Sequence, residues 1–230
     1  MTKAGGMWPG GTAMQFYKKH VYTRIVSLLG DPKPIREVRE RLIPLAHGEV
    51  LEIGVGPGTN FVHYDPARVS KLYALEPNPE MIRLAERQRR RTGLNVEYLG
   101  LPDESIPLGE GTVDAIVSTF TLCTVPGVAE VIQGLRRVMK PGGTLVFFEQ
   151  GLSPDPRVRR WQERWEPVLR RVFAGIRLTR DIPSLITKGS FRIEQMQAAY
   201  LASFPKSWTY CCWGLARSPG GVNDGARDPS

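Results

Sequence analysis

The sequence predicts an α/β domain with a mostly parallel sheet of seven strands and helices on both of its faces. Short runs of β-branched and other apolar residues alternate with longer segments of helical periodicity, which is typical of βαβ units. The 230 residues include 41% hydrophobic residues and only three cysteines, so a core can form without disulfide staples. These observations exclude a disulfide scaffold, a repeat array and a low-complexity chain.

The expected elements follow one another in a regular order. The strands are predicted at residues 49–53, 71–76, 95–99, 113–119, 144–149, 191–200 and 207–216. Helices are predicted at 79–91 and 128–139 between strands, and at 14–29 and 35–45 as a helical cap (14–46) before the first strand. The last two strands are expected to close the sheet edge as an antiparallel pair.

A single domain is expected over residues 14–216, with flexible ends at 1–13 and 217–230 that are rich in glycine, proline and serine. The first residues lack the apolar core of a secretory signal, and the longest apolar runs are too short to span a bilayer. We therefore expect a cytoplasmic protein. Its net charge of +8 favours anionic partners in general without naming one.

A helical insertion after the fifth strand, residues 151–190, has a different composition. The apolar residues of its helical part recur at spacings of three and four, and arginines from Arg157 to Arg171 flank them: Trp161, Trp165, Val168, Leu169, Val172 and Phe173. We favour the interpretation in which this stripe packs on the sheet and the arginines are solvated. The alternative is peripheral contact with an anionic membrane through the Arg157–Arg171 helix. No nucleic-acid-binding motif is present, no metal site is predicted, and the oligomeric state stays open.

A glycine loop follows the first strand directly, with glycines at Gly54, Gly56 and Gly58. Glycines at the carboxyl end of a central strand allow a tight turn and the close approach of a ligand to the backbone. Thr59 stands where a dinucleotide fingerprint requires its third glycine, and no tyrosine has a lysine four positions later. Both observations count against the alternative of an NAD(P) oxidoreductase.

An acidic residue, Glu76, ends the second strand. A carboxylate at this place can accept hydrogen bonds from the hydroxyls of a ribose. Because the chain contains no phosphate-binding P-loop pattern, the expected ligand is a nucleoside without a diphosphate.

Four linked motifs stand in order over about a hundred residues: LEIGVGPGT at 51–59, ALEPN at 74–78, TVDAIVST at 112–119 and VMKPGGTL at 138–145. In these motifs the chain resembles the class I S-adenosylmethionine-dependent methyltransferases, which have a Rossmann-like fold. The resemblance implies S-adenosylmethionine as cofactor. It further implies contacts to the methionine moiety from Glu52, Gly54, Gly56 and Gly58. Contacts to the ribose are implied for Glu76 and Pro77, and contacts to the adenine for Asp103 and Glu104. The floor under the sulfonium is implied to consist of Thr119, Thr121 and Leu122.

A narrower resemblance covers more of the chain. STFTLCTV at 118–125, FFEQ at 147–150, LTRD at 178–181 and YCCWG at 210–214 are similar to the thiol methyltransferases and their bacterial relatives designated phospholipid or thiol methyltransferases. This chain has Gln150 and Ile176 where those proteins usually have histidine and cysteine. The resemblance implies methyl transfer to a small-molecule or lipid-like acceptor through a thiol, an amine or a hydroxyl. The alternative is a non-catalytic module that binds a nucleoside or docks on membranes.

Methyl transfer from a sulfonium chiefly requires alignment of the acceptor, and a base is needed only where the acceptor must lose a proton. Two side chains are candidates for catalytic roles. Glu149, at the end of the fifth strand, could orient an acceptor or assist with a proton, or it could instead cap a turn. His20 lies on the cap helix, where Phe16, Tyr17 and Tyr22 are candidates to line the acceptor pocket.

Overall fold

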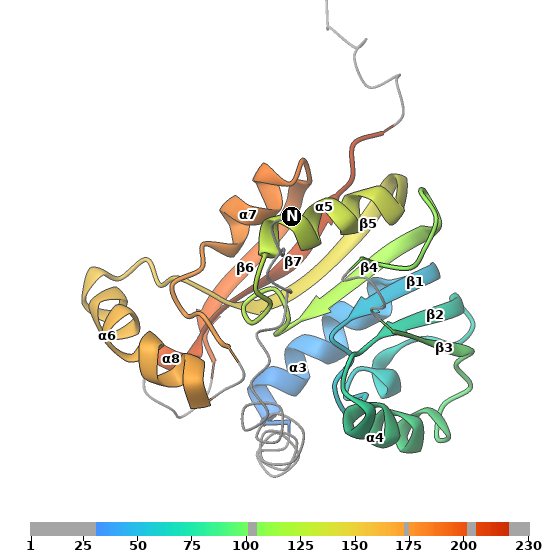
Figure 1. Ribbon diagram of the computed structural model, residues 1–230, viewed down its shortest axis with the longest axis horizontal. Coiled ribbons are helices and arrows are strands. Elements are labelled where there is room, and N and C mark those ends of the chain that lie inside the picture. Colours follow the sequence, from blue (N-terminus) through green and yellow to red (C-terminus); the bar gives the residue numbers. More distant parts are fainter. Residues whose placement is uncertain (1–30, 101–104, 173–174, 202–205, 221–230) are drawn as a thin grey trace, which may run out of the picture.

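The computed structural model describes residues 31–100, 105–172, 175–201 and 206–220. Its seven strands form one sheet in the order β3-β2-β1-β4-β5-β7-β6 (Figure 1). The first five strands are parallel, and β7 runs antiparallel to both of its neighbours. The strands are β1 Gly48–Ile53, β2 Val69–Leu75, β3 Val96–Leu99, β4 Val113–Thr119, β5 Met139–Gln150, β6 Arg192–Tyr200 and β7 Tyr210–Arg217. The predicted Rossmann-like fold class is confirmed.

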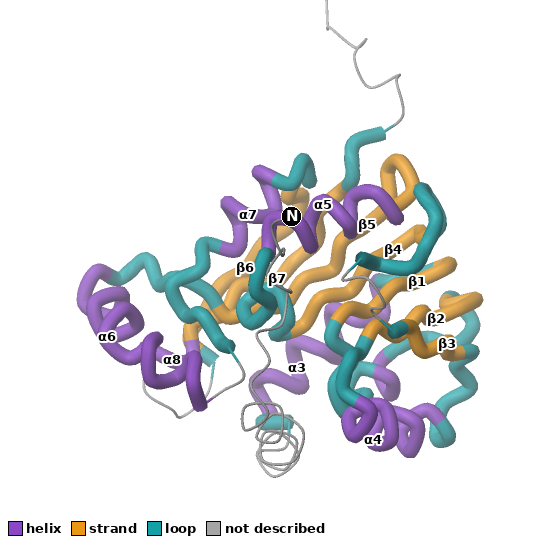
Figure 2. The backbone as a smooth tube through the Cα atoms, viewed as in Figure 1, coloured by secondary structure: helices purple, strands orange, loops and turns teal. Residues whose placement is uncertain are grey.

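Helices cover both faces of the sheet (Figure 2). They are α3 Lys33–Leu42, α4 Pro79–Arg89, α5 Val128–Val138, α6 Pro156–Val172, α7 Ile182–Lys188 and α8 Lys206–Thr209, with 3-10 turns η2 Ile43–Leu45 and η3 Phe61–His63. The side chains of α3, η3 and α4 pack on one face, and those of α5 and α7 pack on the other. Successive residues of a strand point to opposite faces of the sheet. Val50 therefore belongs to the core beneath α3, η3 and α4, and Leu51 to the core beneath α5 and α7. The predicted helix at 14–29 lies outside the described residues.

The strand order reverses between β1 and β4, which are neighbours although β2 and β3 separate them in sequence. Ile53 of β1 pairs with Leu75 of β2 on one side and with Ser118 of β4 on the other. The carboxyl ends of these three strands therefore meet at one edge. In open α/β sheets this switch point is where ligands bind.

Two predicted boundaries were wrong. Strand β5 begins at Met139, five residues before the predicted start, because Met139 already pairs with Val113 ahead of a register shift. Its Pro141, Gly142 and Gly143 have the composition of a turn, which hides this part of the strand in the sequence. Residues 207–209 belong to the short helix α8, and β7 starts only at Tyr210.

The favoured interpretation of the α6 stripe was also wrong. Trp161, Trp165 and Val168 do not pack on the sheet: they are 55%, 41% and 48% exposed. Leu169 of the predicted stripe is buried, together with Val158 and Gln162 on the adjoining side of the helix. The side chains of Val172 and Phe173 are outside the described part of the chain. In Figure 1, α6 lies at one end of the molecule beside α8, away from the two helical layers.

Two further findings concern the described residues as a whole. None of their helices combines the length and the apolar character that crossing a bilayer requires. Cys123, Cys211 and Cys212 are free thiols, and all three are buried.

Candidate active site

The glycine loop between β1 and η3 takes a conformation that favours glycine at three positions. Gly54, Gly56 and Gly58 have φ values of +65°, +57° and +78°. A Cβ at Gly54 would lie 2.2 Å from Thr121 Oγ1, and a Cβ at Gly58 would lie 2.9 Å from the Cα of Ala85. At Gly56 the nearest atom, Gly54 O, would be 3.9 Å away, which is an ordinary contact, so this residue is not tightly packed. Gly54 and Gly58 thus allow close packing, and Gly56 leaves the backbone approachable.

Glu76 lies against this loop. One of its carboxylate oxygens accepts a hydrogen bond from the Gly56 N–H at 2.9 Å, and the other accepts one from Asn78 N–H at 2.8 Å. Burial raises the pKa of Glu76, and the two backbone donors oppose that shift. A carboxylate has about four acceptor positions, so positions remain for the hydroxyls of a ligand. The neighbouring Pro77 is exposed.

Glu52 lies beneath the loop and is almost fully buried. Its carboxylate accepts hydrogen bonds from Asn60 Nδ2 and from the Tyr64 hydroxyl, each at 2.8 Å. Burial raises the pKa of Glu52 to about 7, against the opposing effects of Tyr64, Asn60 and Arg39. Through these two hydrogen bonds Glu52 fixes residues 60–64, which follow the glycine loop.

Arg39 of α3 joins the same network and was missed by the sequence analysis. Its guanidinium donates to Asn60 Oδ1 and, at 3.3 Å, to Thr119 Oγ1. It lies over the rings of Phe120 and Phe148, 5.6 and 5.9 Å from their centroids. Burial lowers the pKa of Arg39. An arginine in a helix is usually solvated, so nothing in the sequence distinguishes this one.

The chain after β4, residues 119–122, lies at the same edge of the sheet as the glycine loop and Glu76. These segments together border the predicted ligand site, here called the crevice, and residues 119–122 are its predicted floor. Phe120 has a φ of +52°, an unusual conformation for a bulky residue, and its N–H donates to Phe148 O at 2.9 Å. Such backbone strain persists where surrounding contacts enforce it, and it clusters at functional sites. Thr121 donates from its hydroxyl to Ile53 O at 3.0 Å, which ties this floor to the end of β1.

Glu149 holds the floor turn from one side. Its carboxylate is fully buried and accepts hydrogen bonds from the Ser118 hydroxyl at 2.6 Å and from the N–H groups of Thr121, Leu122 and Cys123, each at 3.0 Å. Burial raises the pKa of Glu149, but four donors aimed at it favour the ionised form. This geometry supports the turn-capping interpretation of Glu149 and gives no support to proton exchange with an acceptor.

Arg180 holds the same turn from the other side. Its guanidinium donates to the carbonyl oxygens of Leu122 and Val125. The preceding Thr179 donates its N–H and its hydroxyl to Glu166 on α6, at 2.8 and 2.6 Å. Arg180 stands in one of the resemblance motifs, yet the motif alone assigns it no role.

The structure thus brings the glycine loop, Glu76 and the floor residues Thr119, Thr121 and Leu122 to one edge of the sheet. Leu122 is fully buried and contributes packing and backbone only. The remaining predicted residues lie outside the described part of the chain and stay predictions: Phe16, Tyr17, His20, Tyr22, Asp103 and Glu104.

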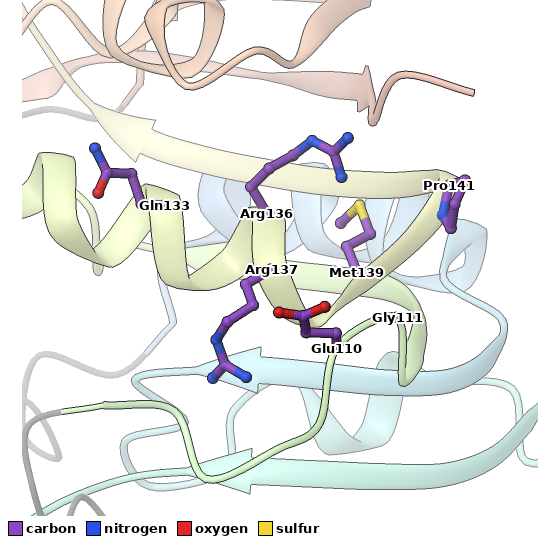
Figure 3. Close-up of a pocket in the computed structure, with 7 residues that line it drawn as sticks. All are labelled: Glu110, Gly111, Gln133, Arg136, Arg137, Met139 and Pro141. Carbon is purple, nitrogen blue, oxygen red and sulfur yellow. The ribbon is translucent and has the colours of Figure 1, made fainter. Parts of the chain in front are cut away.

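An open depression lies at the opposite edge, where β4 and β5 begin (Figure 3). Arg136 and Arg137 leave α5 in opposite directions there, and Arg137 donates to Ile106 O and Leu108 O at 2.7 and 2.6 Å. None of its lining residues belongs to the crevice described above. Arg137 therefore has a structural role, and the depression is separate from the candidate site.

Comparison with known proteins identifies the family of this chain. A family model described as "Methyltransferase domain" matches residues 51–147, which hold the glycine loop, Glu76 and the floor. Human thiol S-methyltransferase TMT1B is 30% identical over 190 residues, covering 80% of this chain and 71% of that protein. The chain belongs to the S-adenosylmethionine-dependent methyltransferases. The predicted resemblance, including its thiol methyltransferase branch, is confirmed.

Solved structures share the fold of this methyltransferase. An S-adenosylmethionine-dependent methyltransferase from Methanosarcina mazei superposes with a TM-score of 0.58 at 20% identity, covering 83% of this chain and 99% of that one. Geranyl diphosphate methyltransferase, in complex with GPP and sinefungin, gives a TM-score of 0.61 at 15% identity over 80% of this chain and 77% of that one.

The residues of this methyltransferase fit its cofactor, S-adenosylmethionine. Gly56 leaves the backbone of the loop open, and Glu76 keeps free acceptor positions beside it. When bound, the cofactor supplies a methyl group on a positively charged sulfur. The chain's own contribution is rigidity: Glu149 and Arg180 fix the floor turn, and Glu52 and Arg39 fix Asn60 beside it. Such positioning is the main requirement of an in-line displacement.

Proposed function

We propose that this methyltransferase transfers the methyl group of S-adenosylmethionine to the sulfur of a small apolar thiol. The observation that carries the proposal is the contact between Glu76 and the Gly56 N–H, because it puts a carboxylate with free acceptor positions next to the approachable part of the loop. In this assignment Glu76, with Pro77 beside it, binds the ribose. The loop from Glu52 to Gly58 carries the methionine moiety, and Asp103 and Glu104 contact the adenine.

A thiol is the acceptor that the crevice suits best. The thiolate is the reactive form of a thiol, and a nearby cation lowers the pKa of a thiol. The buried guanidinium of Arg39 lies beside Thr119 and Phe120 at the floor. Curated relatives named thiol S-methyltransferases support this choice.

An apolar acceptor is consistent with the partly buried rings of Phe120 and Trp213, which pack on the fully buried Phe148. Phe120 and Phe148 pack with centroids 4.7 Å apart, and Trp213 of β7 meets Phe148 edge-on at 6.0 Å. Because apolar thiols partition into lipid, the proposal includes peripheral contact of the enzyme with a membrane surface. The proposal keeps His20 as a candidate for a catalytic role. It keeps Phe16, Tyr17 and Tyr22 as candidates to line the acceptor pocket.

Calorimetry with S-adenosylhomocysteine tests the cofactor part of the proposal. Glu76→Gln should weaken binding at least roughly a hundredfold, since two hydrogen bonds to a charged group are each worth about 1.5–3 kcal/mol. The matched control is Glu80→Gln on the first turn of α4, whose carboxylate pairs with the exposed Arg83 and should leave binding unchanged. Unaltered affinity in Glu76→Gln would refute the ribose assignment.

A screen with labelled methyl donor tests the acceptor part. Matched acceptors that differ only in a thiol, hydroxyl or amine group should be methylated on sulfur alone. Arg39→Met should reduce the rate most below the pKa of the thiol, where the thiolate depends on the cation. Transfer to the amine or the hydroxyl in place of the thiol would overturn the thiol assignment and leave the methyltransferase intact.

A further inference from the structure

Helix α6 presents an apolar surface to solvent, here called the α6 aromatic face: Trp161, Trp165 and Val168. These three side chains are each at least two-fifths exposed and recur at spacings of four and three, on one side of the helix. We propose that the α6 aromatic face is a docking surface for anionic membranes. The inference deepens the proposed function, on which it rests for its apolar acceptor.

Polar side chains attach α6 to the rest of the protein. Gln162, which is 1% exposed, donates to Gly151 O at 3.0 Å and accepts from Ser153 N–H at 2.9 Å. Glu166 accepts two hydrogen bonds from Thr179. A surface helix of a globular protein normally turns its aromatic residues inward and its polar residues outward. Here two polar side chains turn inward and two tryptophans turn outward, which points to a partner outside the described fold.

The charges beside this face identify the partner. Arg157, Arg160, Arg164 and Arg171 recur at spacings of three, four and seven, which places them on one flank of the α6 aromatic face. All four are exposed, and within the described residues none of them forms an ion pair. Tryptophans bordered by arginines on an exposed helix are typical of helices that lie in the interface of an anionic bilayer.

A second copy of the chain is a poorer occupant. In a symmetric contact the same patch meets itself, so the arginine flanks of two copies would lie close together. The net charge of +8 adds to that repulsion. Negatively charged headgroups have the complementary sign, and the tryptophan rings have the amphipathic character that suits the boundary between headgroups and acyl chains.

Co-sedimentation of the full chain with phosphatidylcholine vesicles, with and without phosphatidylserine, tests the inference. The wild type should bind the anionic vesicles in preference, and added salt should weaken that binding. Trp161→Ala/Trp165→Ala should reduce binding at least about tenfold, because affinity scales with the apolar area inserted. Trp161→Phe/Trp165→Phe should retain most of the affinity.

The charge part has a matched control on the same helix. Arg160→Gln/Arg164→Gln should weaken binding roughly twentyfold, at about fivefold per arginine near the surface. Arg159→Gln/Arg170→Gln removes the same charge from the other side of α6 and should have only a small effect. Equal losses in both pairs would show attraction by net charge alone and overturn the docking surface.

Two control measurements separate this inference from the proposed function. Each variant should bind S-adenosylhomocysteine like the wild type, which shows that it is folded. A wild type that methylates a soluble thiol but ignores anionic vesicles overturns the docking surface only. A wild type that binds vesicles yet methylates no thiol overturns the thiol proposal and leaves the docking surface standing. Self-association lost in Trp161→Ala/Trp165→Ala, without vesicle binding, would assign the face to a second copy and overturn the inference.

Discussion

The crevice at the carboxyl edge of the sheet and helix α6 place charged and apolar side chains in opposite ways. In the crevice, Glu52, Glu149 and Arg39 are buried, and each is hydrogen-bonded to neighbouring polar groups. On α6, tryptophans lie in solvent while Gln162 is buried. Burying a charge is costly unless it is paired and hydrogen-bonded, and exposing large aromatic side chains forgoes hydrophobic stabilisation.

Each region therefore departs from the arrangement that stability alone would select. The crevice departs from it to hold a loop and a turn rigidly where a ligand must be aligned. Helix α6 departs from it where, on our proposal, a surface outside the protein completes the burial. Unusual burial therefore has a different explanation in each region. In the crevice, buried charged groups hold the segments that align a ligand; on α6, exposed tryptophans serve the proposed attachment to a membrane.

The largest expected effect concerns Glu149→Gln. Three of the four donors share one carboxylate oxygen, and the Cys123 N–H uses the other. The amide keeps only one acceptor oxygen and places its own N–H groups where the second was, so at least one backbone donor loses its partner. We expect the free energy of unfolding to fall by about 3 kcal/mol. Urea unfolding measures it. The control is Glu194→Gln on the edge strand β6, where exposed pairs with Arg192 and Arg217 should contribute less than about 1 kcal/mol. Similar losses in both variants would contradict the turn-capping role.

A pH dependence of intermediate size is expected from Glu52. Its folded-state pKa of about 7 lies above its ordinary value of 4.5, because burial disfavours the carboxylate. Its contribution to stability is therefore fully present below pH 4.5 and is lost as the pH rises through 7. Glu52→Gln imitates the protonated side chain and should remove this loss. The wild type should lose up to about 3 kcal/mol relative to the variant across that range.

Denaturant titrations of both proteins over the range of pH measure this difference directly. All other titrating groups are shared, so their contributions cancel in the comparison. Parallel stability curves would show that Glu52 stays ionised in the folded state throughout.

The smallest effect is expected on the outer side of α6. Trp161→Ser removes an exposed side chain and should change the free energy of unfolding by no more than about 0.5 kcal/mol. Leu169→Ala, on the buried side of the same helix, should cost about 2 kcal/mol or more. Thermal unfolding of the two variants in the absence of lipid distinguishes them. A large loss in Trp161→Ser would mean that the aromatic face is already covered by the chain itself.

The part of the site that could be predicted is local in sequence. Gly54, Gly56 and Gly58 follow a strand directly, and Glu76 ends the next strand, so spacing alone places them at one edge. Arg39, Tyr64 and Arg180 could not be found this way. Each is an ordinary polar residue in its own segment, and it gains its role only where distant segments pack together.

The fold class, the order of the strands and helices along the chain and the cofactor can be predicted from the amino-acid sequence. These features depend on short-range periodicity and on glycine positions that few other residues can fill. Tertiary packing determines which side of α6 is buried and which groups donate hydrogen bonds to Glu149. A helical pattern shows that an apolar stripe exists but carries no information on what the stripe will face. That choice is made by hydrogen bonds, such as those of Gln162 with residues 151 and 153, which form only after the chain has folded back on itself.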